Sequence, residues 1–348
     1  MDTDFGNKEI MDKITRIKHE LGNDLVILTH HYQRKDIVDL GNHRGDTFAL
    51  AQRVARDEKA KHIVVCGVSF MAESAAILAN DDQTVQIPDP NAGCWMADMA
   101  KPEDVEAAWN EVVDALGKDI VTPVAYMNSH VGVKAFCGRS NGAVCSSSNA
   151  LRTFEWAFEQ REKIFFFPDQ HLGKNTAAAL NIPMETVLIW DPAKPLGGLT
   201  IEALNKAKVI LWKGNCQVHT QFTPDQIKSM RDNFPDASIV VHPECPHDVV
   251  KGADACGSTS FIVRYITDAP ADSTIVVGTE INLIKRLAAE HPDKKILPLS
   301  DAFCPYMHKI NLKNLATTLE NIGQTNIVTL DEKIKKEALT ALENMLNL

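Results

Sequence analysis

Short runs rich in Val, Ile, Leu and Phe recur along the chain, and each is followed by polar residues and then by a stretch with helical spacing. This pattern is typical of strand-to-helix units in a parallel sheet. Few runs alternate between apolar and polar positions, so we expect most strands to be buried on both faces. The predicted strands are residues 25–29, 62–66, 84–87, 121–126, 163–167, 187–190, 209–212, 238–241, 274–277 and 296–299. The fold class is therefore α/β.

The polar residues that follow these strands fall into three sets, and each set closes with a cysteine. The sets run from His30 to Cys94, from Tyr126 to Cys216 and from His242 to Cys304. Ligands of open α/β sheets bind beyond the carboxyl ends of the strands, so we expect the chemistry in these sets. The outer sets have similar lengths, and the longer middle one predicts an insertion that includes residues 181–200. The periodicity by itself also fits an α/β chain without repeats.

Three similar units are therefore predicted, followed by a C-terminal segment. The units are residues 1–104, residues 105–222 with the insertion, and residues 223–322. Residues 323–348 would form a helix that packs on a domain through the apolar stripe of Ile334, Ala338, Leu342 and Met345.

Composition and charge narrow the range of partners. The 348 residues are 45% apolar, which is enough for a large core and excludes a disordered chain. The net charge of −10 argues against binding to nucleic acid or anionic lipid, which favours a small-molecule partner. No apolar run reaches the length of a membrane span, and the first residues do not have the pattern of an export signal. We expect a soluble, cytoplasmic protein.

The eight cysteines form no CxxC pair, which favours cytosolic thiols over disulfides. Cys94, Cys216 and Cys304 each lie just before a helical stretch, whose positive end would lower the thiol pKa. If the three units surround one centre, these thiolates could hold an iron–sulfur cluster with one open iron acting as a Lewis acid. The alternative is that all eight cysteines are buried packing residues. We expect a core position for Cys66, Cys137, Cys145, Cys245 and Cys256.

The polar sets suit a multiply charged substrate, because imidazole and phenol groups both bind anions and transfer protons. His242 and Glu244 would face the same side of an extended segment, which makes Glu244 a candidate acid or base. The hydroxyl-rich turns 146–149 and 257–260 precede helices and resemble anion cradles. Ordinary helix capping is the alternative explanation of each turn.

Several motifs stand in the order found in one enzyme family. They are His30-His31-Tyr32-Gln33, Gly45-Asp46-Thr47, Tyr126-Met127-Asn128-Ser129, Cys145-Ser146-Ser147-Ser148-Asn149-Ala150, Pro168-Asp169-Gln170-His171-Leu172-Gly173, His242-Pro243-Glu244-Cys245 and Gly257-Ser258-Thr259-Ser260. Over nearly its whole length the chain resembles the quinolinate synthases of NAD biosynthesis. The resemblance implies three similar three-layer α/β/α sandwich domains with short parallel sheets, in a pseudo-threefold arrangement around a central active site.

The resemblance also implies a reaction and a cofactor. The reaction is the condensation of iminosuccinate with dihydroxyacetone phosphate to quinolinate, with loss of phosphate and two waters. The cofactor is a [4Fe-4S] cluster held by Cys94, Cys216 and Cys304. Iminosuccinate would come from L-aspartate oxidase or aspartate dehydrogenase, as a functional coupling.

By position, the resemblance implies roles for individual residues. Those implied to bind substrate are His30, Thr47, Tyr126, Met127, Asn128, Ser147, His242, Glu244 and Thr259. Those implied to handle protons are Tyr32, His171 and Glu244. Two competing hypotheses are a hydro-lyase that acts on a dicarboxylate without phosphate and a redox-sensing binding protein whose cysteines report oxygen.

Overall fold

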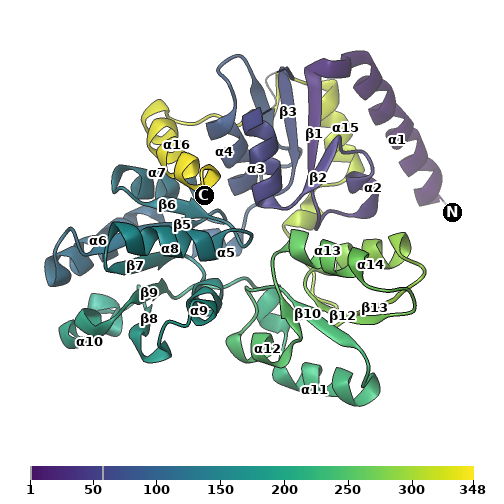
Figure 1. The fold of residues 1–348 in the computed structure, drawn as a ribbon. Coiled ribbons are helices and arrows are strands. Elements are labelled where there is room, and N and C mark those ends of the chain that lie inside the picture. The colour runs from purple at the N-terminus through teal and green to yellow at the C-terminus, as the bar shows by residue number, and fades with distance from the viewer. Residues whose placement is uncertain (1, 57–58) are drawn as a thin grey trace.

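The computed structural model describes residues 2–56 and 59–348, which contain three parallel sheets arranged around a common centre (Figure 1). We call each sheet with its covering helices a unit. The first sheet contains β1 (Leu25–His30), β2 (His43–Gly45), β3 (His62–Cys66) and β4 (Thr84–Gln86). The second contains β5 (Val121–Tyr126), β6 (Ala143–Cys145), β7 (Lys163–Phe167), β8 (Val187–Trp190) and β9 (Val209–Trp212). The third contains β10 (Ser238–Val241), β11 (Ala255–Cys256), β12 (Thr274–Gly278) and β13 (Lys295–Pro298).

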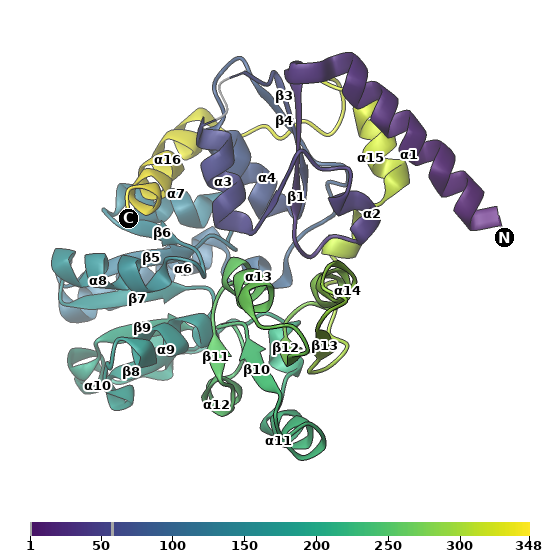
Figure 2. The same cartoon turned by 45° about the vertical axis from the view of Figure 1, so that its right-hand side comes forward.

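Helices cover both faces of each sheet, which makes every unit a three-layer sandwich (Figure 2). The α-helices are α1 (Asp2–Leu21), α2 (Lys35–Val38), α3 (Thr47–Arg56), α4 (Ser69–Leu78), α5 (Trp95–Asp98), α6 (Pro102–Leu116), α7 (Val131–Arg139), α8 (Ala150–Gln160), α9 (Gln170–Ala179), α10 (Ile201–Lys206), α11 (Pro224–Asn233), α12 (His247–Gly252), α13 (Thr259–Asp268), α14 (Ile281–Glu290), α15 (Leu312–Glu320) and α16 (Glu332–Leu346). The 3-10 helices are η1 (Gly22–Asp24), η2 (Met184–Thr186), η3 (Pro195–Gly198), η4 (His219–Gln221) and η5 (Met307–Lys309).

The three sheets share one strand order. They run β2-β1-β3-β4, β6-β5-β7-β9-β8 and β11-β10-β12-β13, so the first strand of each unit is always second in its sheet. The additional strand β8 lies at the edge of the second sheet, within the predicted insertion. The predicted α/β class with short parallel sheets is confirmed, while the residue boundaries of the units stay predictions.

The ten predicted strands are all present, and their burial follows from the sheet type. β1, β5 and β7 are buried along their whole lengths, as expected for parallel strands covered by helices on both faces. Within the described residues the structure adds β2, β6 and β11, which the sequence analysis missed. Each has only two or three residues at a sheet edge, which is too short for a hydrophobic pattern.

The C-terminal segment links the units. α15 packs on α1, and the chain then crosses the edge of the first sheet, where the buried Gln86 side chain donates to the Thr325 carbonyl at 2.5 Å and accepts from the Gly323 N–H at 2.8 Å. α16 finally packs on α7 and β6 of the second unit. Asp331 caps α16 by accepting from the N–H groups of Lys333 and Ile334.

The close approach of α7 and α16 gives a test of this docking. A Cβ atom at Gly138 would lie 1.8 Å from the Glu337 carbonyl oxygen, and neither backbone can move without separating the helices. We expect Gly138→Ala to lower the free energy of unfolding by about 3 kcal/mol, because overpacking outweighs the gain in helix propensity of about 1 kcal/mol. Chemical denaturation measures this change.

The matched control is Gly252→Ala in α12, where the nearest atom to a new Cβ is a methyl group of Ile227 at 3.2 Å. We expect a change below about 1 kcal/mol there. Equal effects of the two substitutions would contradict the tight α7–α16 contact.

Candidate active site

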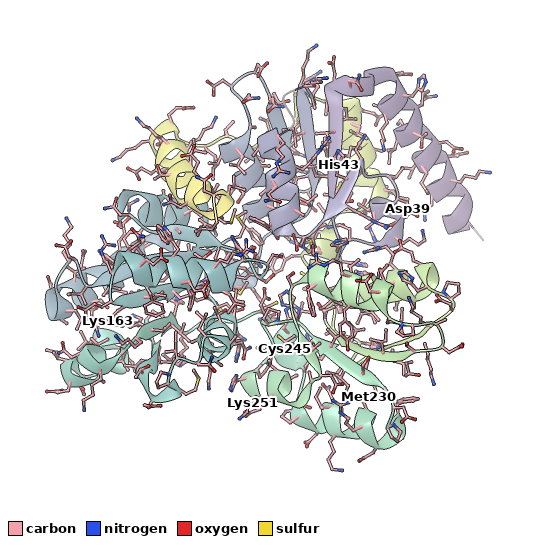
Figure 3. All side chains as sticks on the ribbon, viewed as in Figure 1. Asp39, His43, Lys163, Met230, Cys245 and Lys251 are labelled. Atoms are coloured by element: carbon pink, nitrogen blue, oxygen red, sulfur yellow. The ribbon has the colours of Figure 1, made fainter. Side chains whose placement is uncertain are left out.

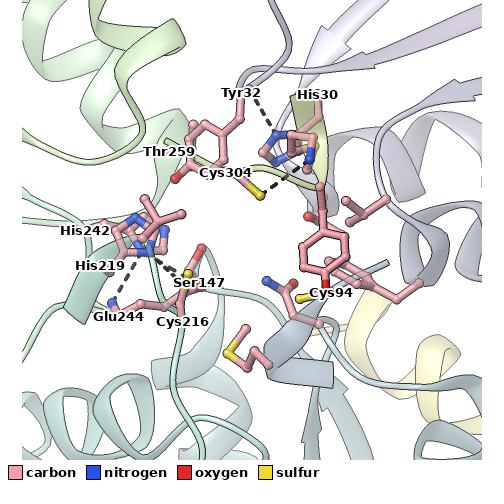
Figure 4. Close-up of a pocket in the computed structure, with 18 of the residues that line it drawn as sticks. His30, Tyr32, Cys94, Ser147, Cys216, His219, His242, Glu244, Thr259 and Cys304 are labelled. Atoms are coloured by element: carbon pink, nitrogen blue, oxygen red, sulfur yellow. Dashed lines mark hydrogen bonds and ion pairs between the residues drawn. The ribbon is translucent and has the colours of Figure 1, made fainter. Parts of the chain in front are cut away.

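A pocket opens at the centre, where the carboxyl ends of the three sheets meet (Figure 4). His30 ends β1, Tyr126 ends β5 and His242 directly follows β10, so the equivalent strand of each unit delivers one residue to the pocket wall. The pocket contains about 850 Å³ of space between atoms, including its open mouth. Its position agrees with the rule that ligands of α/β sheets bind beyond the strand ends.

The structure brings most of the candidate residues to this pocket. Those lining it are His30, Tyr32, Thr47, Cys94, Tyr126, Asn128, Ser147, Cys216, His242, Glu244, Thr259 and Cys304. Met127 and His171 are not among the lining residues. Met127 is fully buried, and its sulfur accepts a hydrogen bond from the Ser74 hydroxyl. His171 lies in the first turn of α9, where its backbone N–H donates to the capping Asp169.

The Glu244 carboxylate is the central polar group of the wall. Its Oε1 accepts from the Tyr126 hydroxyl at 2.5 Å, and its Oε2 accepts from His219 Nδ1 at 2.9 Å. Burial raises the pKa of Glu244, but the neighbouring His219 and His242 rings and the hydrogen bonds from His219 and Tyr126 lower it by more. The result is a pKa well below the ordinary value, so Glu244 is ionised at neutral pH although it is only 3% exposed.

His219 is a functional candidate that the sequence analysis missed. Its Nε2 lies 3.1 Å from the Thr279 hydroxyl, which in turn lies 2.7 Å from the Tyr32 hydroxyl. A hydrogen-bonded chain therefore runs from Glu244 through His219 and Thr279 to Tyr32. Its position three residues after Cys216 is a local sequence signal that points to His219, but that spacing does not reveal its contact with Glu244.

His30 and His242, which also line the wall, are neutral. Burial lowers the pKa of His30 to about 4 and that of His242 to about 3. His30 Nδ1 accepts from the Tyr32 backbone N–H at 3.1 Å, and His242 Nδ1 accepts from the Glu244 N–H at 3.3 Å. Since Nδ1 is an acceptor in both rings, the single proton of each neutral ring is on Nε2. Both rings can therefore donate a hydrogen bond to an anion.

Cys94, Cys216 and Cys304 come from three distant parts of the chain and face the same space (Figure 4). Burial raises the pKa of Cys94 to about 12 and that of Cys304 to about 11, and it raises the pKa of Cys216 well above its usual value. The prediction that helix ends lower these pKa values is wrong. Backbone N–H groups do act on Cys94 and Cys304, but desolvation of the thiolate is the larger effect.

The two hydroxyl-rich turns combine capping with lining of the pocket. The Ser258 hydroxyl accepts from the Phe261 N–H and caps α13, while the next residue, Thr259, lines the pocket and donates to the Tyr32 hydroxyl at 3.0 Å. In the other turn the Asn149 carboxamide oxygen accepts from the Ser146 N–H, and Ser147 faces the pocket. Local hydrogen bonds thus fix the conformation of each turn, and one hydroxyl group of each turn faces the pocket.

Within the described part of the chain, no helix combines the length and the apolar character that are needed to cross a membrane.

Comparison with known proteins places this site in a family. Residues 12–347 match the family model described as "Quinolinate synthetase A protein". The chain is 46% identical to a quinolinate synthase of a Nocardioides species over 97% of this chain and 89% of that protein. It is 45% identical to the quinolinate synthase of Corynebacterium glutamicum, over 97% of this chain and 87% of the relative, and 44% identical to that of Bacillus mycoides, over 97% and 93%. A match of this extent shows that the chain belongs to the quinolinate synthase family, whose members act in NAD biosynthesis.

Proposed function

We propose that this pocket condenses iminosuccinate with dihydroxyacetone phosphate to quinolinate. Closing the pyridine ring forms one C–C and one C–N link between the substrates and releases phosphate and two waters, so the atoms balance without an oxidant. Iminosuccinate would be supplied by L-aspartate oxidase or aspartate dehydrogenase. The eight free thiols suit a reducing compartment, and we propose the cytoplasm.

The three pocket cysteines are proposed to hold a [4Fe-4S] cluster. Their donor set fits such a group, because three half-buried thiols whose pKa values are raised become thiolates when a strongly positive group neutralises them. Three cysteine ligands leave a fourth position open, as in catalytic metal sites. When bound, the cluster supplies a Lewis-acidic iron to the substrates.

Proton transfer is assigned to Glu244 with Tyr126. Glu244 is ionised and can accept a proton from a substrate carbon, and His219 holds the carboxylate in place from the other side. Burial and the charge of Glu244 raise the pKa of Tyr126 well above its usual value, so the phenol stays protonated and can donate to a leaving hydroxyl. The Cys216 sulfur lies within 4.8 Å of the His219 and Glu244 ligand atoms, which supports proton transfer close to the thiols.

Substrate anions are proposed to bind to neutral donors. The Nε2–H groups of His30 and His242 can donate to carboxylate or phosphate oxygens. Thr47, Ser147 and Thr259 supply hydroxyl groups at the wall. Roles for His171 and Met127 would be indirect, since neither lines the pocket. The observation that carries the whole proposal is that the acid/base group and the three cysteines share one pocket built by all three units.

Anaerobically purified protein should be brown, contain about four irons per chain and release phosphate in step with quinolinate. Cys216→Ser should remove most of the iron, because the cluster loses one of its ligands. Cys256→Ser, outside the pocket, is the control and should keep it. Iron analysis and product assays measure these outcomes. Turnover of a dicarboxylate without dihydroxyacetone phosphate would support a hydro-lyase instead, and an active, iron-free enzyme would contradict the cluster.

Glu244→Gln should keep the absorption spectrum of the cluster while quinolinate formation falls by about 10²- to 10⁴-fold, because the amide cannot accept a proton. The control is Glu337→Gln, an ion-paired glutamate on α16 that contacts Arg139 at 3.1 Å, and its turnover should stay within about twofold of wild type. Normal turnover of Glu244→Gln would exclude Glu244 from the mechanism.

A further inference from the structure

Lys134, in α7 of the second unit, has a fully buried ammonium group outside the pocket. Its Nζ donates to the Ser129 carbonyl oxygen at 2.5 Å, and among the described residues no carboxylate forms an ion pair with it. Burial lowers the pKa of Lys134 to about 8, although the negative charge of Glu73 opposes that shift. A buried cation without an ion-pair partner is destabilising, so a position that holds one needs another explanation.

The group that Lys134 contacts belongs to the turn between β5 and α7, residues 127–130. The Ser129 hydroxyl donates to the Tyr126 carbonyl at 2.7 Å, and the Met127 N–H donates to the Cys145 carbonyl at 2.7 Å. Lys134 thus completes a chain of hydrogen bonds from its ammonium group through Ser129 to the backbone of Tyr126. The turn is therefore hydrogen-bonded to α7 through Lys134 and to β6 through the Cys145 carbonyl.

The far end of this turn is held by the first unit. Glu73, in α4, accepts from the Val131 N–H at 3.2 Å, at the start of α7. Lys134 Nζ also lies 5.7 Å from the centre of the Phe70 ring, and Phe70 lines the pocket. The turn is therefore clamped between an ammonium group from its own unit and a carboxylate from the neighbouring one.

The clamped turn carries two pocket groups. Tyr126, at the end of β5, donates to Glu244, and Asn128 lines the pocket with a buried carboxamide oxygen that has no hydrogen-bond partner in the described protein. A shift of the turn would move the phenol away from Glu244 and turn the Asn128 amide away from the substrate. Misplacement of reacting groups by about 1 Å lowers rates by about 10²-fold.

We propose that Lys134 is a positioning residue for the condensation, whose ammonium group holds the β5–α7 turn so that Tyr126 and Asn128 face the substrates. This inference rests on the proposed function, because it assigns those two residues to the same pocket. Lys134 does not line the pocket and acts only through the backbone of the turn.

The test compares Lys134→Met, Ser129→Ala and the double variant, with turnover expressed per bound cluster. Lys134→Met should lower kcat by about 10- to 100-fold, because methionine fills the space but cannot hold the Ser129 carbonyl. Ser129→Ala should lower kcat by a smaller factor. Since both substitutions release the same turn, the double variant should be no slower than Lys134→Met alone, whereas independent sites would multiply their effects.

Lys163 provides a matched control, because it is another buried lysine bonded to carbonyls. It donates to the Asn205 and Ala207 carbonyl oxygens at 2.8 and 2.7 Å, and Figure 3 shows it in the second unit, well away from the centre of the molecule. Lys163→Met should lower thermal stability but leave kcat within about twofold of wild type. A merely structural role of Lys134 would give the same result in both lysine variants and would overturn the proposal.

The outcomes separate this inference from the function it rests on. Wild-type protein that makes no quinolinate would refute the proposed function. Active wild type together with unchanged kcat in Lys134→Met, or fully multiplicative effects in the double variant, would refute only the role of Lys134. If Lys134→Met does not fold, Ser129→Ala decides: a loss of several-fold in kcat supports the clamp, and unchanged kcat overturns it.

Discussion

The ionised carboxylate of Glu244, buried where the units meet, is the interaction on which the rest of the site depends. An unpaired charge in this position would destabilise the fold by several kcal/mol. Its hydrogen-bond donors therefore have to be brought into place as the whole chain folds. Tyr126 comes from the second sheet, and His219 comes from the segment that joins the second unit to the third. Assembly of the units and formation of the hydrogen-bonded Glu244 carboxylate are therefore coupled.

The same burial sets the charge of the other pocket groups. It keeps His30 and His242 neutral and holds the three cysteine thiols in their protonated forms. Apart from the carboxylates of Glu244 and Asp46, the wall therefore offers hydrogen-bond donors and soft sulfur atoms, a combination suited to anionic substrates and a positive inorganic group. The segment from Cys216 to His219 joins the two kinds of chemistry, because one short turn supplies both a sulfur atom and the partner of Glu244.

Contacts far from the pocket maintain this arrangement. The C-terminal segment crosses the first sheet at Gln86 and ends as α16 on the second unit, so one continuous stretch of chain ties two units together. Glu73 accepts from the Val131 N–H at the start of α7, and Lys134 donates to the Ser129 carbonyl in the β5–α7 turn. These contacts act on the backbone, and we propose that in this way residues outside the pocket determine where the pocket side chains lie.

The sequence by itself determined the α/β class, ten of the strands and the C-terminal helix, because these depend on local patterns of apolar residues. The order of motifs also identified the family, and most of the site residues that it implied line the pocket. Three short edge strands escaped notice, because two or three residues carry no periodicity. His219 was missed because its role depends on Glu244, 25 positions away in the chain.

Only the tertiary structure decided how the groups behave. The prediction of lowered pKa values for Cys94 and Cys304 rested on local helix N–H groups. Burial, which depends on all three units, raises their pKa values instead. His171 and Met127 belong to family motifs, yet their side chains lie outside the pocket wall. Charge state and side-chain direction follow from packing between distant segments, and no local pattern of residues contains that information.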